Sequence, residues 1–452
     1  MKSLIVMLKR QFIWALFLLP VAAAGQSPLD RYIQEGLTNN IALQQKALSL
    51  QQAETALAIA RGYFFPSIQL IADYTSGDGG RSIALPVGDL LNPVYRSLNQ
   101  LTQSDAFPEI QNVEQNFFPK DFYDARVRTS LPIVNADLII NRSIKSKELL
   151  MADSDVRRYK RQLTFDITEA YYKHLAAGEA VKIFEGAMGI VEKNVQINES
   201  LRRNGKGLPA QVLRSKSELE RVRAELNSAR NSFSNSRKYF NFLLNRELDA
   251  PIDLPTEVGE PVQSASLEIE TAGREELAMA KIGTEISHSV VRMNQLKRLP
   301  KVSAFLDLGS QASGWQFNDQ SQYYLLGVQF SLPLFQGFTN QLSIRQSKMN
   351  EQKAALALRD ASQAVALSAN LALSELLNAK SNYTASQEQL KSATGYFSLI
   401  ERGYAEGINT LIEFLDARNQ LTTSELLNNV RRFELFIANA KLTRETASAH
   451  LN

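Results

Sequence analysis

The chain of 452 residues contains no cysteine and only three histidines. Without cysteine, the chain has no disulfide bonds, thiol catalysis, thiolate metal sites or lipidation of an N-terminal cysteine. His174, His288 and His450 lie far apart in the sequence and match no metal-ligand spacing. We also find no phosphate-binding loop and no nucleophile elbow. The sequence therefore predicts no enzyme, no cofactor and no metal site, and each histidine is interpreted as a surface or packing residue.

An excess of charge of one sign is also missing. Fifty Lys and Arg residues oppose 47 Asp and Glu residues, which gives a formal net charge of +3. A nucleic-acid-binding protein would be expected to carry a clustered basic surface, so the charge argues against that class. The composition, 44% hydrophobic and 21% charged, is that of an ordinary folded protein.

Long apolar runs are missing beyond the N-terminus. There, basic residues precede an apolar run from Phe12 to Ala24, which predicts a secretory signal peptide over residues 1–25. A retained anchor helix is the alternative, but the run is shorter than the ~20 apolar residues that a membrane span needs. An exported chain without a spanning helix is either soluble outside the cytoplasm or inserted in a membrane as β-strands.

The sequence does contain an internal repeat, in which the same order of turn, long helix and glycine occurs twice. A Ser-Leu-Pro turn occurs at Pro132 and again at Pro333, and each is followed by a long helical stretch that a glycine interrupts. Gly207 comes 75 residues after the first proline, and Gly407 comes 74 residues after the second. Such a duplication implies that each half buries its apolar face against another copy of the unit.

We divide the chain accordingly into two repeats. The predicted segments are the first repeat 26–250 with strand hairpin 66–132 and helical hairpin 135–247, the linker 251–273, and the second repeat 274–452 with strand hairpin 300–333 and helical hairpin 337–450. The first strand hairpin is longer because of residues 76–121, whose glycine and proline content favours an extended outward-facing loop over a small separate domain.

Each strand hairpin has two runs of alternating apolar and polar residues. Each run is about 10 residues long, the length of a tilted strand that crosses a bilayer. Asp124, Arg126 and Arg128 share one face of the second run, where a wet channel lumen would accept them. A soluble sandwich also has alternating strands and remains an alternative. Four strands cannot close a membrane barrel, so membrane strands require several copies, and three copies supply 12 strands.

The helical stretches predict rods rather than compact domains. Each runs for about 70 residues without proline, which corresponds to roughly 100 Å of helix. The helix after each glycine carries apolar residues at steps of three and four, the spacing of supercoiled helices. A shift of 200 residues pairs Val212 with Ile412, Leu226 with Leu426 and Phe233 with Phe433. Asn419, Thr422 and Asn429 make the second seam more polar, as expected for helices that line a water-filled tube.

The order of these elements resembles the TolC-like outer-membrane efflux family. The segments that carry the resemblance are residues 40–66, which end in Tyr63-Phe64-Phe65-Pro66, the two Ser-Leu-Pro turns with residues 333–337, and residues 404–417. The resemblance implies an α+β membrane protein: a trimeric, 12-stranded transmembrane barrel with four strands per chain, continued by a long α-helical coiled-coil barrel. It also implies an outer-membrane location with the helices in the periplasm.

The resemblance further implies roles for the helical tips. The tip turns would close the periplasmic entrance and contact a periplasmic adaptor protein. These turns contain Gly207, Leu208, Gly407 and Ile408. Tyr404 matches a tyrosine of the family's closing network, whereas Asn409 and Leu213 replace the arginine and aspartate that such networks can pair.

The resemblance also assigns a constriction at the entrance. Glu413 and Asp416 match two acidic positions that narrow the entrance in the family, and their spacing puts them on one helix face. Six such carboxylates in a trimer would favour cations, and like-charge repulsion would raise their pKa. The alternative is that both are solvated surface acids.

The predicted function is a passive outer-membrane exit duct that contacts outer-membrane lipid and works with a periplasmic adaptor and an inner-membrane transporter. Three alternatives stay open: a type I protein-secretion duct of the same fold, a periplasmic or surface coiled-coil protein, and a cytosolic rod. The last explains neither the signal peptide nor the strands.

Overall fold

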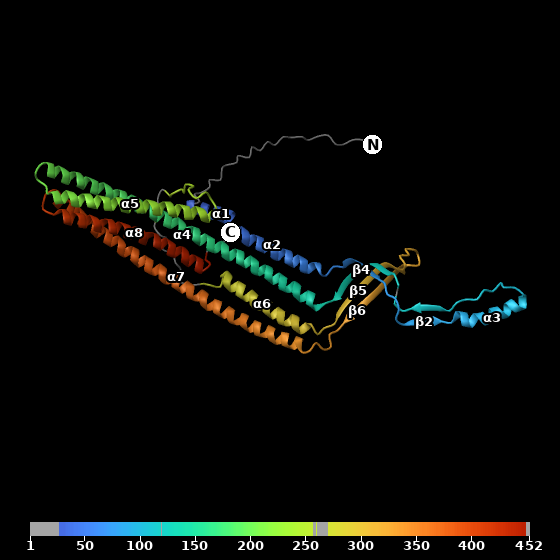
Figure 1. Ribbon diagram of the computed structural model, residues 1–452. Helices are drawn as coiled ribbons and strands as arrows, with labels where there is room; N and C mark the ends of the chain where they lie inside the picture. The colour runs from blue at the N-terminus through green and yellow to red at the C-terminus, as the bar shows by residue number, and fades with distance from the viewer. Residues whose placement is uncertain (1–26, 119, 256–258, 260–269, 449–452) are drawn as a thin grey trace, which may run out of the picture. The chain divides into compact units, whose positions relative to one another are not determined.

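The computed structural model describes residues 27–118, 120–255, 259 and 270–448. The predicted signal peptide and His450 lie outside these residues. The helices and strands are α1 (Pro28–Asn39), α2 (Ile41–Gly62), β1 (Ser67–Thr75), β2 (Ser82–Leu85), α3 (Val87–Thr102), β3 (Val113–Asn116), β4 (Phe122–Val134), α4 (Ala136–Arg203), α5 (Pro209–Leu243), α6 (Glu275–Leu296), β5 (Lys301–Ser313), β6 (Gln322–Ser331), α7 (Thr339–Ala405) and α8 (Leu411–Glu445). Figure 1 shows the two long helical hairpins, α4 with α5 and α7 with α8.

The chain divides into two compact units, and each takes segments from both halves of the sequence. Unit 1 contains residues 1–50, 151–281 and 357–452, and unit 2 contains residues 51–150 and 282–356. Unit 1 therefore holds both helical tips, and unit 2 holds all the strands. Among the described residues, no helix is both long enough and apolar enough to cross a membrane.

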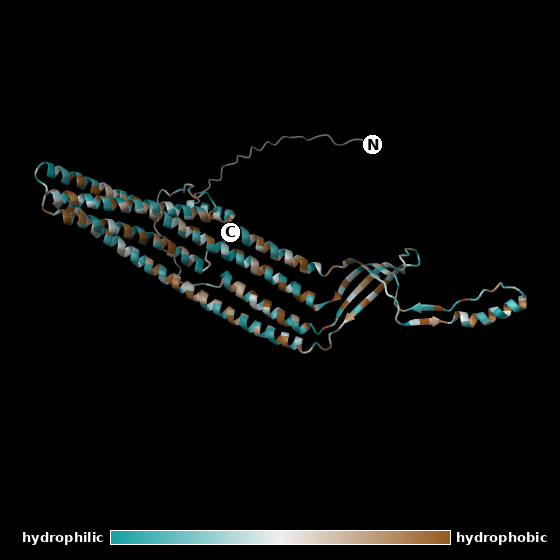
Figure 2. Ribbon diagram, viewed as in Figure 1, coloured by the Kyte–Doolittle hydropathy of each residue, from teal (hydrophilic) through white to brown (hydrophobic). Residues whose placement is uncertain are grey.

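Unit 2 is organised by an antiparallel sheet in the order β1-β4-β5-β6. The four strands fall where the alternating runs predict them. The register places Ile68, Leu70, Val127, Leu308, Tyr324, Leu326, Val328 and Phe330 on one face. All of these side chains are at least 40% exposed, although they are apolar. Figure 2 shows hydrophobic and hydrophilic residues alternating along the strands, so the sheet has one bare apolar face and one polar face.

One proline and two glycines shape this sheet. Pro132 lies within β4, and the pairing with β5 shifts register between Pro132 and Val134. A proline cannot donate to the ladder, so it sits where the regular pairing is interrupted. Gly327 lies under the Phe305 ring, and a Cβ there would come within 2.5 Å of that ring. Gly309 likewise leaves room for Arg126.

The long loop between β1 and β4, residues 76–121, contains secondary structure that the prediction of an extended loop did not include, although it forms no separate compact unit. It contains β2, α3 and β3, and β2 pairs with β3. Two asparagines hold this segment together through side-chain hydrogen bonds. Asn92 exchanges two hydrogen bonds with the Ile110 backbone at 2.8 and 2.9 Å, and Asn99 does the same with Phe107 at 2.9 and 3.0 Å. These side chains tie the returning chain to α3, which glycine and proline content does not reveal.

In unit 1 the main apolar core is aromatic. Tyr32 of α1, Tyr171 of α4 and Phe240 of α5 are buried together, with ring centroids between 5.1 and 6.1 Å apart. Further apolar contacts follow the hairpins toward the tips, such as Val191 against Val222. The 200-residue shift fails at the start of the seam, because Val212 is buried and Ile412 is 74% exposed.

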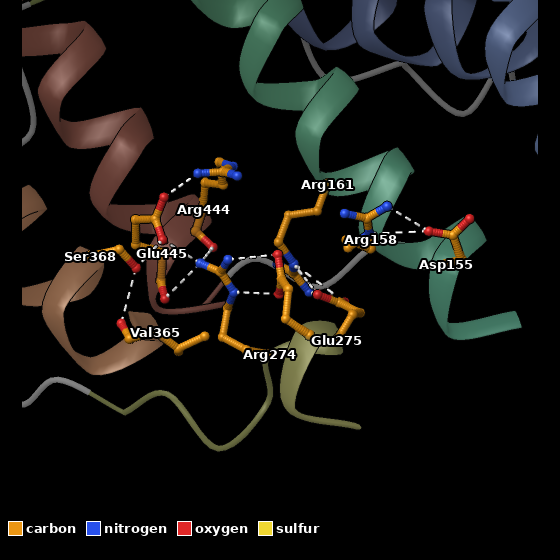
Figure 3. Close-up of polar contacts among 10 residues, drawn as sticks. Asp155, Arg158, Arg161, Arg274, Glu275, Val365, Ser368, Arg444 and Glu445 are labelled. Atoms are coloured by element: carbon orange, nitrogen blue, oxygen red, sulfur yellow. Dashed lines mark hydrogen bonds and ion pairs between the residues drawn. The ribbon is translucent and has the colours of Figure 1, made fainter. Parts of the chain in front are cut away.

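A buried charge cluster joins four helices of unit 1 (Figure 3). Arg274, just before α6, donates to the carboxylates of Glu276 and Glu445 and to the backbone carbonyls of Arg444 and Glu445. Ser368 of α7 also donates to Glu445, at 2.8 Å. Beside this cluster, Arg161 of α4 pairs with Glu275 of α6 at 2.9 Å. Two arginines therefore pair with three glutamates, and the last carbonyls of α8 accept hydrogen bonds from Arg274.

Candidate functional site

The two helical tips of unit 1 enclose a groove of about 900 Å³. Its walls come from the end of α4, the end of α7, the start of α8 and the two turns. Tyr404, Gly407 and Asn409 line it, as do Asn194 and Asn198 of α4. The groove therefore brings predicted entrance residues of the second repeat against the first repeat.

Tyr404 is held by a ring contact and a polar contact. Its ring stacks on Phe414 of α8, with centroids 4.8 Å apart and an angle of 25° between the planes. Its hydroxyl donates to Asn198 Oδ1 at 3.4 Å. A phenol hydroxyl donates here to a side-chain amide, so this contact is a neutral hydrogen bond rather than a salt bridge.

Sequence reasoning missed Asn194 and Asn198. Both are 2% exposed, and Asn198 Nδ2 donates to the Asn194 carbonyl and side-chain oxygens at 2.9 and 3.0 Å. Asn194 Nδ2 is buried without a hydrogen-bond partner among the described residues. Their spacing in the sequence could have revealed them. Asn194 and Asn198 continue, at helical spacing, the row of buried residues formed by Ala187 and Val191.

In the part of the chain that the structure describes, the residues that replace the family's ionic network form no hydrogen bond with the Tyr404 side chain. Asn409 Nδ2 lies 3.4 Å from Glu413 Oε2, and its side-chain oxygen lies against Gly403. Leu213 is 70% exposed. The first repeat therefore holds Tyr404 through α4, and neither of the replaced positions takes part.

Glu413 has a local structural role. Its carboxylate accepts from the Thr410 backbone at 2.6 Å, while the Thr410 hydroxyl accepts from the Glu413 backbone at 3.3 Å. This reciprocal pair is a capping box at the start of α8. The hydrogen bond from the Thr410 backbone, then those from its hydroxyl and from Asn409, lower the pKa of Glu413. Asp416 is exposed one turn later, and the rise in pKa expected from a ring of several copies stays a prediction.

The two tip turns are offset relative to each other. Gly407 has a left-handed backbone, with φ of +77°, and ends α7. In the first turn the left-handed glycine is Gly205, with φ of +72°, and not Gly207. Gly207 is needed for space rather than for a left-handed backbone, because a Cβ there would lie 2.9 Å from Leu201 and from the Arg202 backbone. Leu208 and Ile408 are 64% and 74% exposed, so each turn presents one apolar side chain.

An ion pair links the two hairpins beside the groove. Arg418 of α8 donates to Glu218 of α5, and both side chains are buried. Arg221 donates to the same carboxylate at 2.5 Å. Burial alone would raise the pKa of Glu218, but the hydrogen bond from Arg221 and the charge of Arg418 outweigh it and lower that pKa. The seam pattern gave no indication of this pair.

In unit 2 the predicted lumen residues are brought together on the polar face of the sheet. Arg128 donates two parallel hydrogen bonds to Asp307 at 2.6 and 2.7 Å. Arg126 pairs with Asp124 and lies 3.5 Å from Asp73. Sequence reasoning placed no lumen role on Asp73, Asp307 or Tyr323, whose hydroxyl donates to Asp124 at 2.8 Å. The strand register, which sets Arg128 opposite Asp307, is what joins them.

Two histidines among the described residues have ordinary partners. His174 is buried and lies 2.9 Å from the Ser236 hydroxyl, and the exposed His288 pairs with Glu351 at 2.8 Å. In the described part of the chain, no group of three or more His, Cys, Asp or Glu side chains is placed to hold a metal ion.

The bare apolar sheet face and the long paired hairpins define the architecture of TolC-like outer-membrane channels. Comparison with known proteins agrees. The outer membrane protein VceC of Vibrio cholerae superposes with a TM-score of 0.76 over 92% of this chain and 95% of VceC, at 16% sequence identity. That identity shows likeness of fold alone.

The sequence comparisons identify the family. The model of the outer membrane efflux protein family matches residues 32–246 and 268–446, and the chain belongs to this family. It is 21% identical over 412 residues to the outer membrane protein TolC of Escherichia coli, covering 87% of this chain and 76% of TolC. It is 20% identical over 305 residues to the alkaline protease secretion protein AprF of Pseudomonas aeruginosa, covering 65% of this chain and 63% of AprF.

The family consists of channel proteins and not of enzymes. Its members place this chain in the outer membrane, with the helical part in the periplasm.

Proposed function

We propose that the chain is the exit duct of a tripartite efflux system, a passive channel in the outer membrane that an inner-membrane transporter supplies through a periplasmic adaptor. The sheet of unit 2 carries the proposal. Its apolar face suits lipid, and its opposite face, with Asp124, Arg126 and Arg128, suits a water-filled lumen.

The assembly that we propose is a homotrimer. Within the described part of the chain, β1 pairs only with β4 and β6 pairs only with β5. Each edge strand therefore has one side free for a strand of another copy. Four strands are too few to close a barrel, and three copies supply 12, enough for a wide channel. The paired arginines of the polar face would then line the lumen without leaving a large net charge on it.

The helical hairpins would continue this channel through the periplasm and end at the tips. There the exposed apolar residues Leu208 and Ile408 are available to the adaptor. The groove lined by Tyr404 and Asn409 lies where the two hairpins meet. Together with Glu413 and Asp416 of the same tip, it would set how far the entrance opens. Movement of cargo needs no catalytic group, because the transporter supplies the energy.

The assembly is tested by native mass spectrometry of the detergent-solubilised protein and by conductance in planar bilayers. We expect a three-chain species that floats with outer-membrane vesicles, resists detergent until heated, and conducts ions. A soluble monomer in the periplasm would contradict the proposal and favour a structural coiled-coil protein.

Protein secretion is the second candidate function, because AprF is named as a protease secretion protein and is similar over 65% of this chain. Deletion of the gene separates the two. Increased retention of fluorescent dyes in the deletion strain supports efflux. Loss of a protein from the culture medium, with unchanged dye retention, supports secretion.

A further inference from the structure

A pocket of about 420 Å³ lies in unit 2, where the sheet meets the helices. Lys297 and Arg298, just after α6, form one side, and residues 332–341, which connect β6 to α7, form much of the rest. We propose that this junction pocket binds the phosphate headgroup of a membrane phospholipid, whose acyl chains lie along the apolar face of the sheet. The proposal uses the outer-membrane location and does not depend on the duct function.

The cations of the junction pocket are available to an anion. Lys297 and Arg298 are exposed, and neither forms an ion pair with a carboxylate in the described part of the chain. The nearby Lys301 differs, because it pairs with Asp137 at 2.6 Å. With the Asn340 amide flipped, which gives its oxygen a donor and its nitrogen an acceptor, Arg298 Nε donates to the Asn340 side-chain oxygen at 3.2 Å. This bond orients the guanidinium and leaves its other N–H groups free to donate to a phosphate.

The other side of the pocket is apolar and exposed. Leu334, Phe335 and Phe338 are 89%, 73% and 63% exposed, and the two phenylalanine rings meet edge to face with centroids 5.3 Å apart. Phe338 has a left-handed backbone, with φ of +62°. For a residue with a side chain, that conformation is strained. An apolar ring held outward by strained backbone is suited to a partner outside the chain, such as the interfacial region of a bilayer.

The position of the pocket selects a lipid over free phosphate. Phe330, near the end of β6, lies on the apolar face, and the exposed Leu332 and Leu334 follow directly after the strand. The pocket's cations lie at the end of this face, just past the strands. An anionic group at one end of a long apolar surface matches an amphiphile, as in other basic pockets at the membrane edge.

The two repeats differ at this point, so we expect one site per chain. Pro66 and Pro300 each precede the first strand of a repeat. Lys297 and Arg298 stand three and two residues before Pro300, whereas Tyr63 and Phe64 stand at those places before Pro66. The first repeat thus has aromatic rings where the second has a pair of cations.

The test is native mass spectrometry of the delipidated full chain in detergent, titrated with phosphatidylglycerol. We expect one tightly retained phospholipid per chain, and diacylglycerol with the same acyl chains, which lacks the phosphate, should bind far more weakly. The double variant Lys297→Gln/Arg298→Gln should weaken binding at least about tenfold. Arg61→Gln is the matched control, because Arg61 is an exposed cation at the end of α2 that pairs with no carboxylate among the described residues. This variant should bind like the wild type.

Several results would overturn the proposal. Equal binding of phosphatidylglycerol by the double variant and the wild type would remove the cations from the site. Displacement of the lipid by an excess of inorganic phosphate would identify a simple anion site. Leu334→Ser tests the apolar side without touching the charges. If this variant reduces the number of chains in the assembly and leaves lipid binding unchanged, the pocket is a contact between copies and the proposal is wrong.

Discussion

Glu218 and Arg418 occupy the same place in the two repeats, 200 residues apart, and form a buried ion pair with each other. Arg418 is 1% exposed and Glu218 is 6% exposed. The pair joins α5 to α8 beside the groove between the tips. The duplicated position therefore carries opposite charges in the two copies, and the two copies meet through them.

Removal of one partner of this pair should strongly destabilise the fold, whereas removal of both should change its stability much less. Arg418→Met leaves the Glu218 carboxylate buried beside Arg221 alone, and loss of one partner from a buried pair typically costs about 3 to 5 kcal/mol. We expect the double variant Glu218→Leu/Arg418→Met to recover most of that loss. Thermal unfolding of the single and double variants measures the difference. Arg223→Met is the control, since Arg223 pairs with Glu220 on the surface of α5.

Tyr404 should restrain the entrance mainly through its ring. Tyr404→Phe removes a hydrogen bond of 3.4 Å, whose net contribution is about 1 kcal/mol or less, and keeps the stacking on Phe414. We expect bilayer conductance close to that of the wild type for Tyr404→Phe and higher conductance for Tyr404→Ala. Because both partners are neutral, high salt should not open the entrance. Tyr396→Ala, at an exposed tyrosine of α7, serves as the control. Equal conductance of all variants would remove Tyr404 from the gate.

The roles of Glu413 and Asp416 should be separable by substitution. Asp416→Asn removes an exposed charge, and we expect weaker block of the channel by divalent cations. Glu413→Gln should have the same electrical effect while it keeps the capping box, because glutamine also serves at that position. Glu413→Ala should in addition destabilise the start of α8 by about 1 kcal/mol. Bilayer recordings with Mg²⁺, together with thermal unfolding, distinguish these effects, and unchanged block in both charge variants would exclude a constriction.

His174 should make stability depend on pH. The ring is 2% exposed, and burial, then the charge of Arg237, lower its pKa to about 4. The unfolded histidine takes up a proton near pH 6.5 and the folded one does not. Stability therefore falls as the pH drops from about 6.5 to about 4, by about 3 kcal/mol in total.

Unfolding at pH 7.5 and 4.5 tests the role of His174. His174→Gln should lose less stability than the wild type between these two values, because other groups titrate in both proteins. His288→Gln, at an exposed histidine, should follow the wild type. Parallel pH profiles for all three proteins would show that His174 contributes nothing.

Local pattern was sufficient for the four strands of the main sheet and for the long helices, but not for β2, α3 and β3. The two-residue period located the four strands and both faces of the sheet, because each strand is exposed to two different surroundings. Absence of proline and a following glycine predicted the long helices, and the turn at Gly407 has the left-handed backbone that glycine favours. The asparagine contacts of the long loop were missed, since Asn92 and Asn99 act on backbone 8 to 18 residues away.

The sequence by itself determined the long helices, the repeated plan and the four strands of the two-faced sheet, because these depend on spacing along one chain. Only the tertiary structure decided which side chains meet. Tyr404 contacts Asn198 across 206 residues, Arg128 contacts Asp307 across 179, and Arg418 contacts Glu218 across 200. Such partners are chosen by the register of strands and by the packing of one hairpin on the other, and periodicity within a single element carries no information about either.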